Sequence, residues 1–172
     1  MATIGNLAYV LRYKLAVGRA RRGDDRLRLA HRVRHLGDAY YYAGRPALAE
    51  PCYVEALSIY RGDNHTRPLD LANSIRSYAV LMHESGAYHE ARSLWQEAHD
   101  LYEALEIPAG IAESAARLAL LARYHGDLER SRECLTEART AANAAADPET
   151  LQYIREVTAQ IGNSIDDTRG AR

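Results

Sequence analysis

Phenylalanine is absent from this chain of 172 residues, tryptophan occurs once, and there are two cysteines and five prolines. Valine and isoleucine are sparse, so strand-favouring residues are scarce, whereas alanine, leucine and arginine, which favour helices, dominate. Hydrophobic residues at 47% and charged residues at 26% exclude the composition of a disordered chain. The sequence therefore predicts an all-α globular protein, and its length suits one domain, residues 1–172.

Long apolar runs are absent as well. No stretch of about 18 consecutive apolar residues occurs, and such a stretch is the minimum for a membrane-spanning helix. Arg12 and Lys14 interrupt the apolar segment near the N-terminus, which argues against a signal peptide. We therefore expect no membrane partner and a cytoplasmic location.

The net charge is only −1, but the two signs are unevenly distributed along the chain. Residues 1–35 contain nine arginines and lysines against Asp24 and Asp25, which gives this segment +7 and leaves −8 for the remainder. Such a basic end can contact nucleic acid or another acidic surface, or it can balance the acidic repeats of the same molecule. Nucleic-acid contact through the basic N-terminal region is the weaker alternative.

The sequence repeats itself with a period of 40 to 42 residues. A shift of 42 residues superposes side chains of similar size or chemistry: Leu27 on Leu69, Ala30 on Ala72, Gly44 on Gly86, Ala49 on Ala91, Tyr53 on Trp95 and Tyr60 on Tyr102. A further shift of 40 superposes Pro68 on Pro108, Ala79 on Ala119, Gly86 on Gly126 and Ala98 on Ala138. Three repeats are therefore present.

Each repeat is predicted to be a helical hairpin. Two segments with helical apolar periodicity flank a turn at Gly44, Gly86 or Gly126, because glycine readily adopts the left-handed conformation that ends a helix. Pro68 and Pro108 stand at the first position of the next helix, where proline's missing donor costs nothing. The predicted repeats are residues 26–62, 68–105 and 108–146.

The order of large and small residues in these units resembles the tetratricopeptide repeat (TPR) family. The first unit has Val33, Leu36, Gly37, Tyr40, Gly44, Ala49, Tyr53 and Ala56; the second has Ile75, Tyr78, Ala79, Met82, Gly86, Ala91, Trp95 and Ala98; the third has Ala115, Leu118, Ala119, Ala122, Gly126, Ser131, Leu135 and Ala138. Because the period exceeds the usual length of about 34 residues, the pattern is similar to the kinesin light chain subtype. The resemblance covers residues 26–146 and implies an α-α superhelix, that is, a TPR solenoid of three hairpins.

A further helix is predicted on each side of the hairpins. Residues 3–20 have leucines at helical spacing, and a shift of 42 places Leu7 on Ala49 and Leu11 on Tyr53, as in a half repeat. A second stripe on the same helix consists of Tyr9, Val10, Tyr13 and Val17. Residues 148–162 have an apolar stripe suited to a C-terminal capping helix, and residues 163–172 are predicted to be a disordered tail.

The resemblance implies a protein or peptide ligand in a concave groove lined by the first helix of every hairpin. The residues that it places there are His31, Arg34, Asp38, Tyr41 and Tyr42 from the first unit, Asn73, Arg76, His83 and Glu84 from the second, and Glu113, Arg123 and Tyr124 from the third. Arginine and asparagine side chains can hold carboxylates through charge-assisted hydrogen bonds, while tyrosines offer flat amphipathic surface. An acidic peptide is therefore the preferred ligand, and a binding scaffold or adaptor the preferred function.

Two other functions remain open at this point. The two-striped N-terminal helix and the alanine-rich segment 141–146 favour self-association, for example a homodimer through the terminal helices. Bacterial arrays of this kind often belong to transcription regulators, so the chain can also be a regulatory module that acts through another protein.

The sequence has none of the common signatures of an enzyme or a cofactor site. A glycine-rich phosphate loop, a nucleophile elbow and a metal-spaced triplet are all missing, so we expect no catalytic residues and no cofactor. His31 and His35 stand four residues apart, a spacing that can chelate zinc, but no third ligand accompanies them, so no metal site is predicted. Cys52 and Cys134 lie two hairpins apart, too far for a disulfide, and are expected to be reduced.

Overall fold

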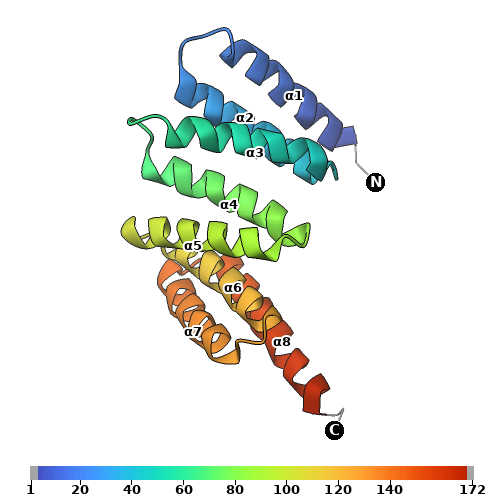
Figure 1. Cartoon of the computed structure of the whole chain (residues 1–172), viewed down its shortest axis with the longest axis vertical. Helices are drawn as coiled ribbons and strands as arrows, with labels where there is room; N and C mark the ends of the chain where they lie inside the picture. The colour runs from blue at the N-terminus through green and yellow to red at the C-terminus, as the bar shows by residue number, and fades with distance from the viewer. Residues whose placement is uncertain (1–3, 170–172) are drawn as a thin grey trace. The chain divides into compact units, whose positions relative to one another are not determined.

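The protein is all-α in the computed structural model, which describes the backbone of residues 4–169 and the side chains of residues 6–161 (Figure 1). In this described part the chain forms eight helices and no strand. The helices are α1 (Ile4–Ala20), α2 (Arg26–Tyr42), α3 (Pro46–Arg61), α4 (Pro68–Glu84), α5 (Tyr88–Ala104), α6 (Pro108–Tyr124), α7 (Leu128–Ala145) and α8 (Pro148–Arg169). The predicted helical-hairpin fold is confirmed. None of the helices within the described residues is long and apolar enough to cross a membrane.

The helices belong to two compact units. Unit 1 is Met1–Leu94 and unit 2 is Trp95–Arg172, so the boundary lies inside α5. Figure 1 shows α1 to α4 lying one after another in unit 1, and α6, α7 and α8 side by side in unit 2. We describe each unit by itself, and the single domain expected from the sequence stays a prediction.

The turns inside the hairpins have the geometry predicted from their glycines. Gly44, Gly86 and Gly126 have φ values of 70°, 81° and 81°. After Gly44, the backbone N–H of Arg45 donates to the carbonyl of Tyr40 at 2.9 Å, and Gly44 itself donates to Tyr41 at 2.9 Å. These two bonds form a Schellman motif, which satisfies carbonyl groups at the helix end. Local sequence therefore fixes where α2 stops and α3 begins.

Small residues allow the helices of unit 1 to approach closely. Ala30, Ala49 and Ala56 are fully buried, together with the large side chain of Tyr53. Gly37 packs directly against that ring, because a Cβ atom at this position would lie 2.7 Å from Tyr53 Cε1. The alternation of small and large residues in the repeat thus serves the packing of α2 on α3.

In unit 2, small residues again allow the helices to pack closely, and a terminal helix adds to the core. Gly110 of α6 packs against the ring of Tyr102, and Ala138 of α7 is fully buried. The helix α8 packs on α6 and α7 and buries Ile154 and Val157. Its backbone stays helical through Arg169, beyond residue 162 where the sequence places the end of the capping helix. Residues 170–172 of the predicted tail lie outside the described residues.

The face of α1 that packs on α2 differs from the prediction. Val10 and Val17 are buried, whereas Leu7, Leu11 and Leu15 are 59%, 58% and 56% exposed. The superposition of Leu7 on Ala49 and Leu11 on Tyr53 is therefore wrong, because it assigns the leucine stripe to the core. Both stripes have helical spacing, so periodicity alone cannot choose between them; the structure buries the stripe with the smaller valines.

Candidate functional site

Nine of the predicted groove residues belong to unit 1, on α2 and α4, which contact each other. We call these nine residues the α2–α4 face: His31, Arg34, Asp38, Tyr41, Tyr42, Asn73, Arg76, His83 and Glu84. The remaining three, Glu113, Arg123 and Tyr124, lie on α6 in unit 2 and are described separately.

Asp38 is the centre of a hydrogen-bond network within unit 1. Its carboxylate accepts a bond from the Tyr53 hydroxyl at 3.0 Å and from Arg34 Nη1 at 3.3 Å, and it lies 3.3 Å from His35 Nδ1. The Asp38 side chain is only 18% exposed. Burial raises the pKa of Asp38, but the bond from His35, the charge of Arg34 and the bond from Tyr53 together lower that pKa below its ordinary value. The carboxylate is therefore ionised, and its acceptor capacity is largely used inside the protein.

The partners of Asp38 are engaged as well. Burial, and then the charge of the neighbouring Asp38, raises the pKa of Tyr53, so its hydroxyl remains a donor. Arg34 is mostly buried, with Nη2 3.0 Å from His35 Nε2. Arg34 and Asp38 thus serve the packing of α2 on α3 more directly than they serve a ligand.

His31 and His35 form part of a row of aromatic rings on α1 and α2. The two imidazoles meet edge to face with centroids 4.5 Å apart, and His35 stacks on Tyr13 of α1 at 5.4 Å. Burial lowers the pKa of His31, and electrostatic interactions with His35 and Arg34 lower it further. Both ring nitrogens of His35 face protein groups, Asp38 and Arg34, so this pair does not form an open chelate.

Two tyrosines at equivalent helix ends are the most accessible of the predicted aromatic residues. Tyr42 is the last residue of α2 and is 70% exposed, and Tyr124 is the last residue of α6 and is 66% exposed. Tyr41 meets the Tyr42 ring edge to face at 5.2 Å, and His125 meets Tyr124 at 5.4 Å. Each exposed ring is therefore braced by a neighbour, which lowers the entropy that a partner must overcome.

The predicted residues of α4 and the rest of α6 are more varied. Asn73, Arg76 and His83 are half-buried, and His83 meets Tyr88 edge to face at 5.7 Å. Glu84 is exposed and occupies in α4 the position that Tyr42 has in α2. In unit 2, Glu113 and Arg123 are half-buried.

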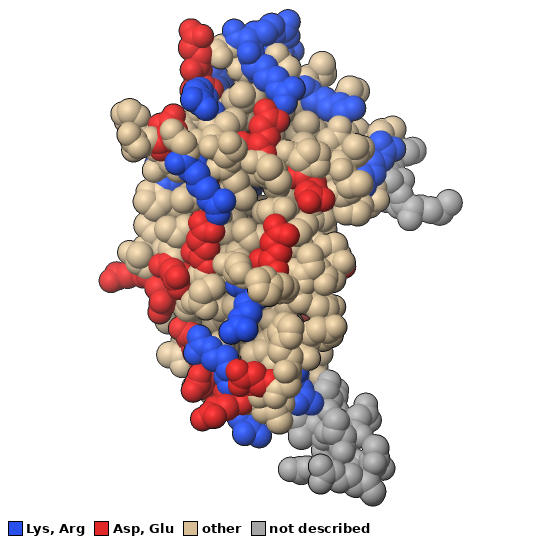
Figure 2. All heavy atoms as spheres, viewed as in Figure 1, with Lys and Arg blue, Asp and Glu red and all other residues tan. Residues whose placement is uncertain are grey.

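The basic N-terminal region is partly neutralised within unit 1. Arg21 pairs with Glu55 of α3 at 2.7 Å. A cavity of about 550 Å³ beside α1 and α2 is lined by Arg12, Arg19, Arg28 and Arg32, but also by Asp24 and Asp25. Figure 2 shows several Lys and Arg side chains gathered at the top of the view, over α1 and α2. Internal balance thus accounts for part of the predicted charge asymmetry.

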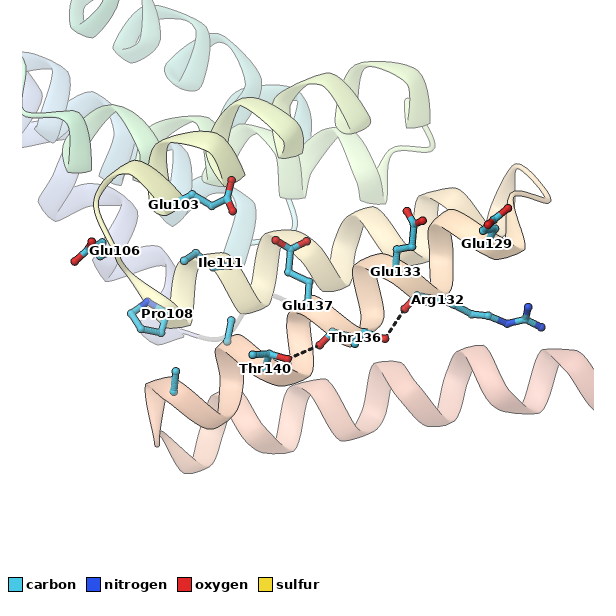
Figure 3. Close-up of a pocket in the computed structure, with 12 residues that line it drawn as sticks. Glu103, Glu106, Pro108, Ile111, Glu129, Arg132, Glu133, Thr136, Glu137 and Thr140 are labelled. Atoms are coloured by element: carbon cyan, nitrogen blue, oxygen red, sulfur yellow. Dashed lines mark hydrogen bonds between the residues drawn. The ribbon is translucent and has the colours of Figure 1, made fainter.

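A pocket in unit 2 contains residues that the sequence did not single out. It has a volume of about 1080 Å³ and lies between the end of α5, the start of α6 and α7 (Figure 3). Its lining includes Glu103 and Glu137, whose carboxylates lie close to the buried His99. The His99–Glu103 spacing of four residues is visible in the sequence, but Glu137 comes from another helix 34 positions further on, so no local motif connects the three.

Comparison with known proteins identifies the fold. No family model and no curated protein sequence matches the chain. Among solved structures, it is similar to BtubC (BKLC) from P. vanneervenii, with 18% identity and a TM-score of 0.75 over 94% of this chain and 67% of that one. It is also similar to aspartyl phosphate phosphatase F from Bacillus subtilis, with 16% identity and a TM-score of 0.79 over 96% of this chain and 45% of that one. The apo form of RapI gives 15% identity and a TM-score of 0.75 over 94% of this chain and 66% of that one.

These likenesses show a TPR-like helical-repeat fold. The chain spans less than half of phosphatase F and about two thirds of the other two proteins.

Proposed function

We propose that this chain is a non-catalytic, protein-binding TPR module, with repeats of the kinesin light chain type, that binds a peptide segment on the α2–α4 face. The observation that carries this proposal is the exposure of Tyr42 beside Tyr41, at the end of a helix that the repeat resemblance assigns to ligand binding. Exposed, pre-ordered aromatic rings are typical anchors of protein interfaces. Tyr124 offers unit 2 an equivalent anchor.

The network around Asp38 divides the face into two roles. Arg34 and Asp38 are held by each other and by Tyr53, so we assign them to positioning the helices. Among the other seven residues of the face, we assign ligand contact to His31, Tyr42 and Arg76. A guanidinium group can form paired hydrogen bonds with a carboxylate, so the assignment of Arg76 favours a ligand with carboxylate groups.

Free thiols support a reducing, cytoplasmic setting for this function. Neither Cys52 nor Cys134 forms a disulfide. Burial, followed by the charge of Glu55, raises the pKa of Cys52 to about 11, so this thiol stays protonated and unreactive. Cysteines that form no disulfide are common in proteins of reducing compartments.

A peptide-display selection followed by binding measurements tests the proposed face. Peptides selected on the intact chain are expected to be rich in Asp and Glu, and their affinity should fall about 10-fold with Tyr42→Ser and about 10-fold with Arg76→Glu, as for interface anchors. The matched control is Arg92→Glu, which makes the same charge change on an exposed position of α5 and should leave affinity unchanged. Fluorescence anisotropy measures each Kd. Selected peptides whose affinity responds equally to Arg76→Glu and Arg92→Glu would refute the assignment.

The leucine stripe of α1 favours self-association as a second function. Leu7, Leu11 and Leu15 are spaced four residues apart on one helix face, and more than half of each side chain is exposed. Single exposed leucines are ordinary, but three in register form an apolar strip that a second copy of α1 would cover.

Sedimentation velocity tests this second function. The wild-type chain is expected to form a dimer, and the double change Leu7→Lys and Leu15→Lys is expected to give a monomer with unchanged helix content. Leu48→Lys serves as the control, since Leu48 is also exposed but lies on α3. A wild-type chain that stays monomeric at concentrations well above micromolar excludes the dimer.

A further inference from the structure

In unit 2, a hydrogen bond to Ser114 determines which ring nitrogen of the buried His99 carries the hydrogen. His99 is only 7% exposed, and its Nδ1 lies 3.0 Å from the Oγ of Ser114. The Ser114 hydroxyl donates its one hydrogen to backbone carbonyls, to Gly110 at 2.7 Å with a longer contact to Ile111 at 3.1 Å. A hydroxyl has a single proton, so Ser114 must accept from His99, and Nδ1 carries the hydrogen. The other ring nitrogen, Nε2, is the one that remains available.

That nitrogen faces two carboxylates. Nε2 lies 3.2 Å from an oxygen of Glu137 on α7 and 3.8 Å from an oxygen of Glu103, which is one turn further along α5. With Nδ1 protonated, a neutral imidazole presents only a lone pair at Nε2, and carboxylate oxygens are also acceptors. Three converging acceptors need a donor or a cation among them, which can be a water molecule from the pocket, a proton on Nε2 or a metal ion.

The spacing of the three groups suits a metal ion. All three ligand atoms lie within 4.8 Å of one another. Ligands bound to zinc at about 2.0–2.2 Å with tetrahedral angles stand about 3.3 Å apart, which is close to the separation of His99 and Glu137. Glu103 is 54% exposed, so its side chain is able to close the slightly longer gap by a small rotation. The bond from His99 to Ser114 is the kind of outer contact that orients metal-binding histidines.

The pocket beside the three groups makes the site accessible and surrounds it with negative charge. The site borders the unit 2 pocket, whose described lining contains five glutamates and one basic residue, Arg132. Figure 3 shows the carboxylates of Glu103 and Glu137 projecting from α5 and α7 into the same space, with Glu133 one turn away on α7. A cleft of this charge concentrates cations, and its opening leaves room for water or another ligand on the ion.

We propose that His99 Nε2, Glu103 and Glu137 bind one divalent transition-metal ion, with Zn²⁺ as the best match, and that Ser114 positions the imidazole. The imidazole ligand favours zinc and its first-row neighbours over Mg²⁺ and Ca²⁺, which prefer sets made only of oxygen. Three protein ligands and an open position place the site in the class that holds an exchangeable fourth ligand. The site belongs to unit 2 and uses no residue of the α2–α4 face, so it does not depend on the peptide-binding proposal.

Zinc titration of the metal-free, untagged full-length chain by calorimetry tests this site. We expect one saturable site, weakened about 100-fold by Glu137→Gln and about 10-fold by Ser114→Ala, as for a lost ligand and a lost outer contact. Glu133→Gln is the matched control, because it removes the same charge from the same pocket and helix without removing a ligand. All variants are made in a His31→Ala background, which removes the other pair of histidines with chelating spacing.

A second readout separates binding from folding. Zinc is expected to raise the melting temperature of the parent chain and of Glu133→Gln. The melting temperatures of Glu137→Gln and Glu103→Gln are expected to stay the same when zinc is added. Glu103 is exposed, so its variant should fold normally and reports on ligation alone. Equal zinc affinity in Glu133→Gln and Glu137→Gln would overturn the proposal. So would a His99 ring that NMR finds protonated on both nitrogens in a chain that does not bind zinc, since the proton would then be the only cation.

Discussion

Gly110→Ala is expected to destabilise unit 2 by about 2 to 3 kcal/mol, whereas Gly18→Ala should stabilise unit 1 by up to about 1 kcal/mol. A Cβ atom on Gly110 would overlap Tyr102 Cγ and lie 2.5 Å from Cδ1, so α6 would have to move away from a buried ring. Gly18 lies within α1 with nothing within 4 Å of an added Cβ, so there the methyl group only improves helix propensity. The same substitution therefore has opposite signs at the two positions.

Urea unfolding measures both effects. Trp95 is the chain's one tryptophan, it is fully buried, and it lies in unit 2, so its fluorescence reports on Gly110→Ala. Circular dichroism follows the helices of both units and reports on Gly18→Ala. If Gly110→Ala proved neutral or stabilising, the close contact between α6 and Tyr102 would be wrong.

Asp38→Ala is expected to destabilise the protein by about 2 to 3 kcal/mol, because it leaves the buried Tyr53 hydroxyl and the mostly buried Arg34 without their shared acceptor. The matched control is Glu90→Ala. Glu90 accepts a bond from Tyr78 at 3.0 Å, which is also a tyrosine-to-carboxylate bond within unit 1, but Glu90 is exposed and water can replace it. Its loss should cost about 1 kcal/mol or less.

The contribution of Asp38 should also depend on pH. Because folding lowers the pKa of Asp38 from its ordinary value of 3.8, the ionised form stabilises the folded state above that value. This stabilisation disappears as the pH falls through the lower, folded-state pKa. The difference in unfolding free energy between wild type and Asp38→Asn is thus expected to be constant near neutral pH and to shrink in acid. A difference that grew in acid would mean that the carboxylate is protonated in the folded protein.

Helix boundaries were predictable from the sequence because local residues determine them. Gly86 adopts a left-handed conformation that costs other residues free energy, and Pro68 occupies the first turn of a helix, where proline is best tolerated. The end and the start of α4 are therefore both marked in the sequence. By contrast, Glu106 is left-handed at the end of α5 without being glycine. Pro108 marks the start of the next helix, but no residue of the turn itself indicates the left-handed conformation.

Features that depend on the meeting of two helices were not predictable. The choice between the two stripes of α1 depends on which one fits α2, and either has the right periodicity. Asp38 has the position of a ligand-contacting residue, and only the approach of Tyr53 from α3 shows that its carboxylate is used internally. One signal was available, since a buried tyrosine requires a hydrogen-bond partner and Asp38 is an acceptor on the adjoining helix.

The position of the unit boundary inside α5 has a practical consequence for dissecting the molecule. A fragment that ended at Leu94 would stop in the middle of a helix and leave four carbonyl groups without their hydrogen-bond donors. Fragments for separate study should therefore be cut in the turns, at Gly86 or between Ala104 and Pro108, so that α5 stays whole in one piece. Comparing the helix content of the two resulting pairs would show which half of the chain needs α5 for its own folding.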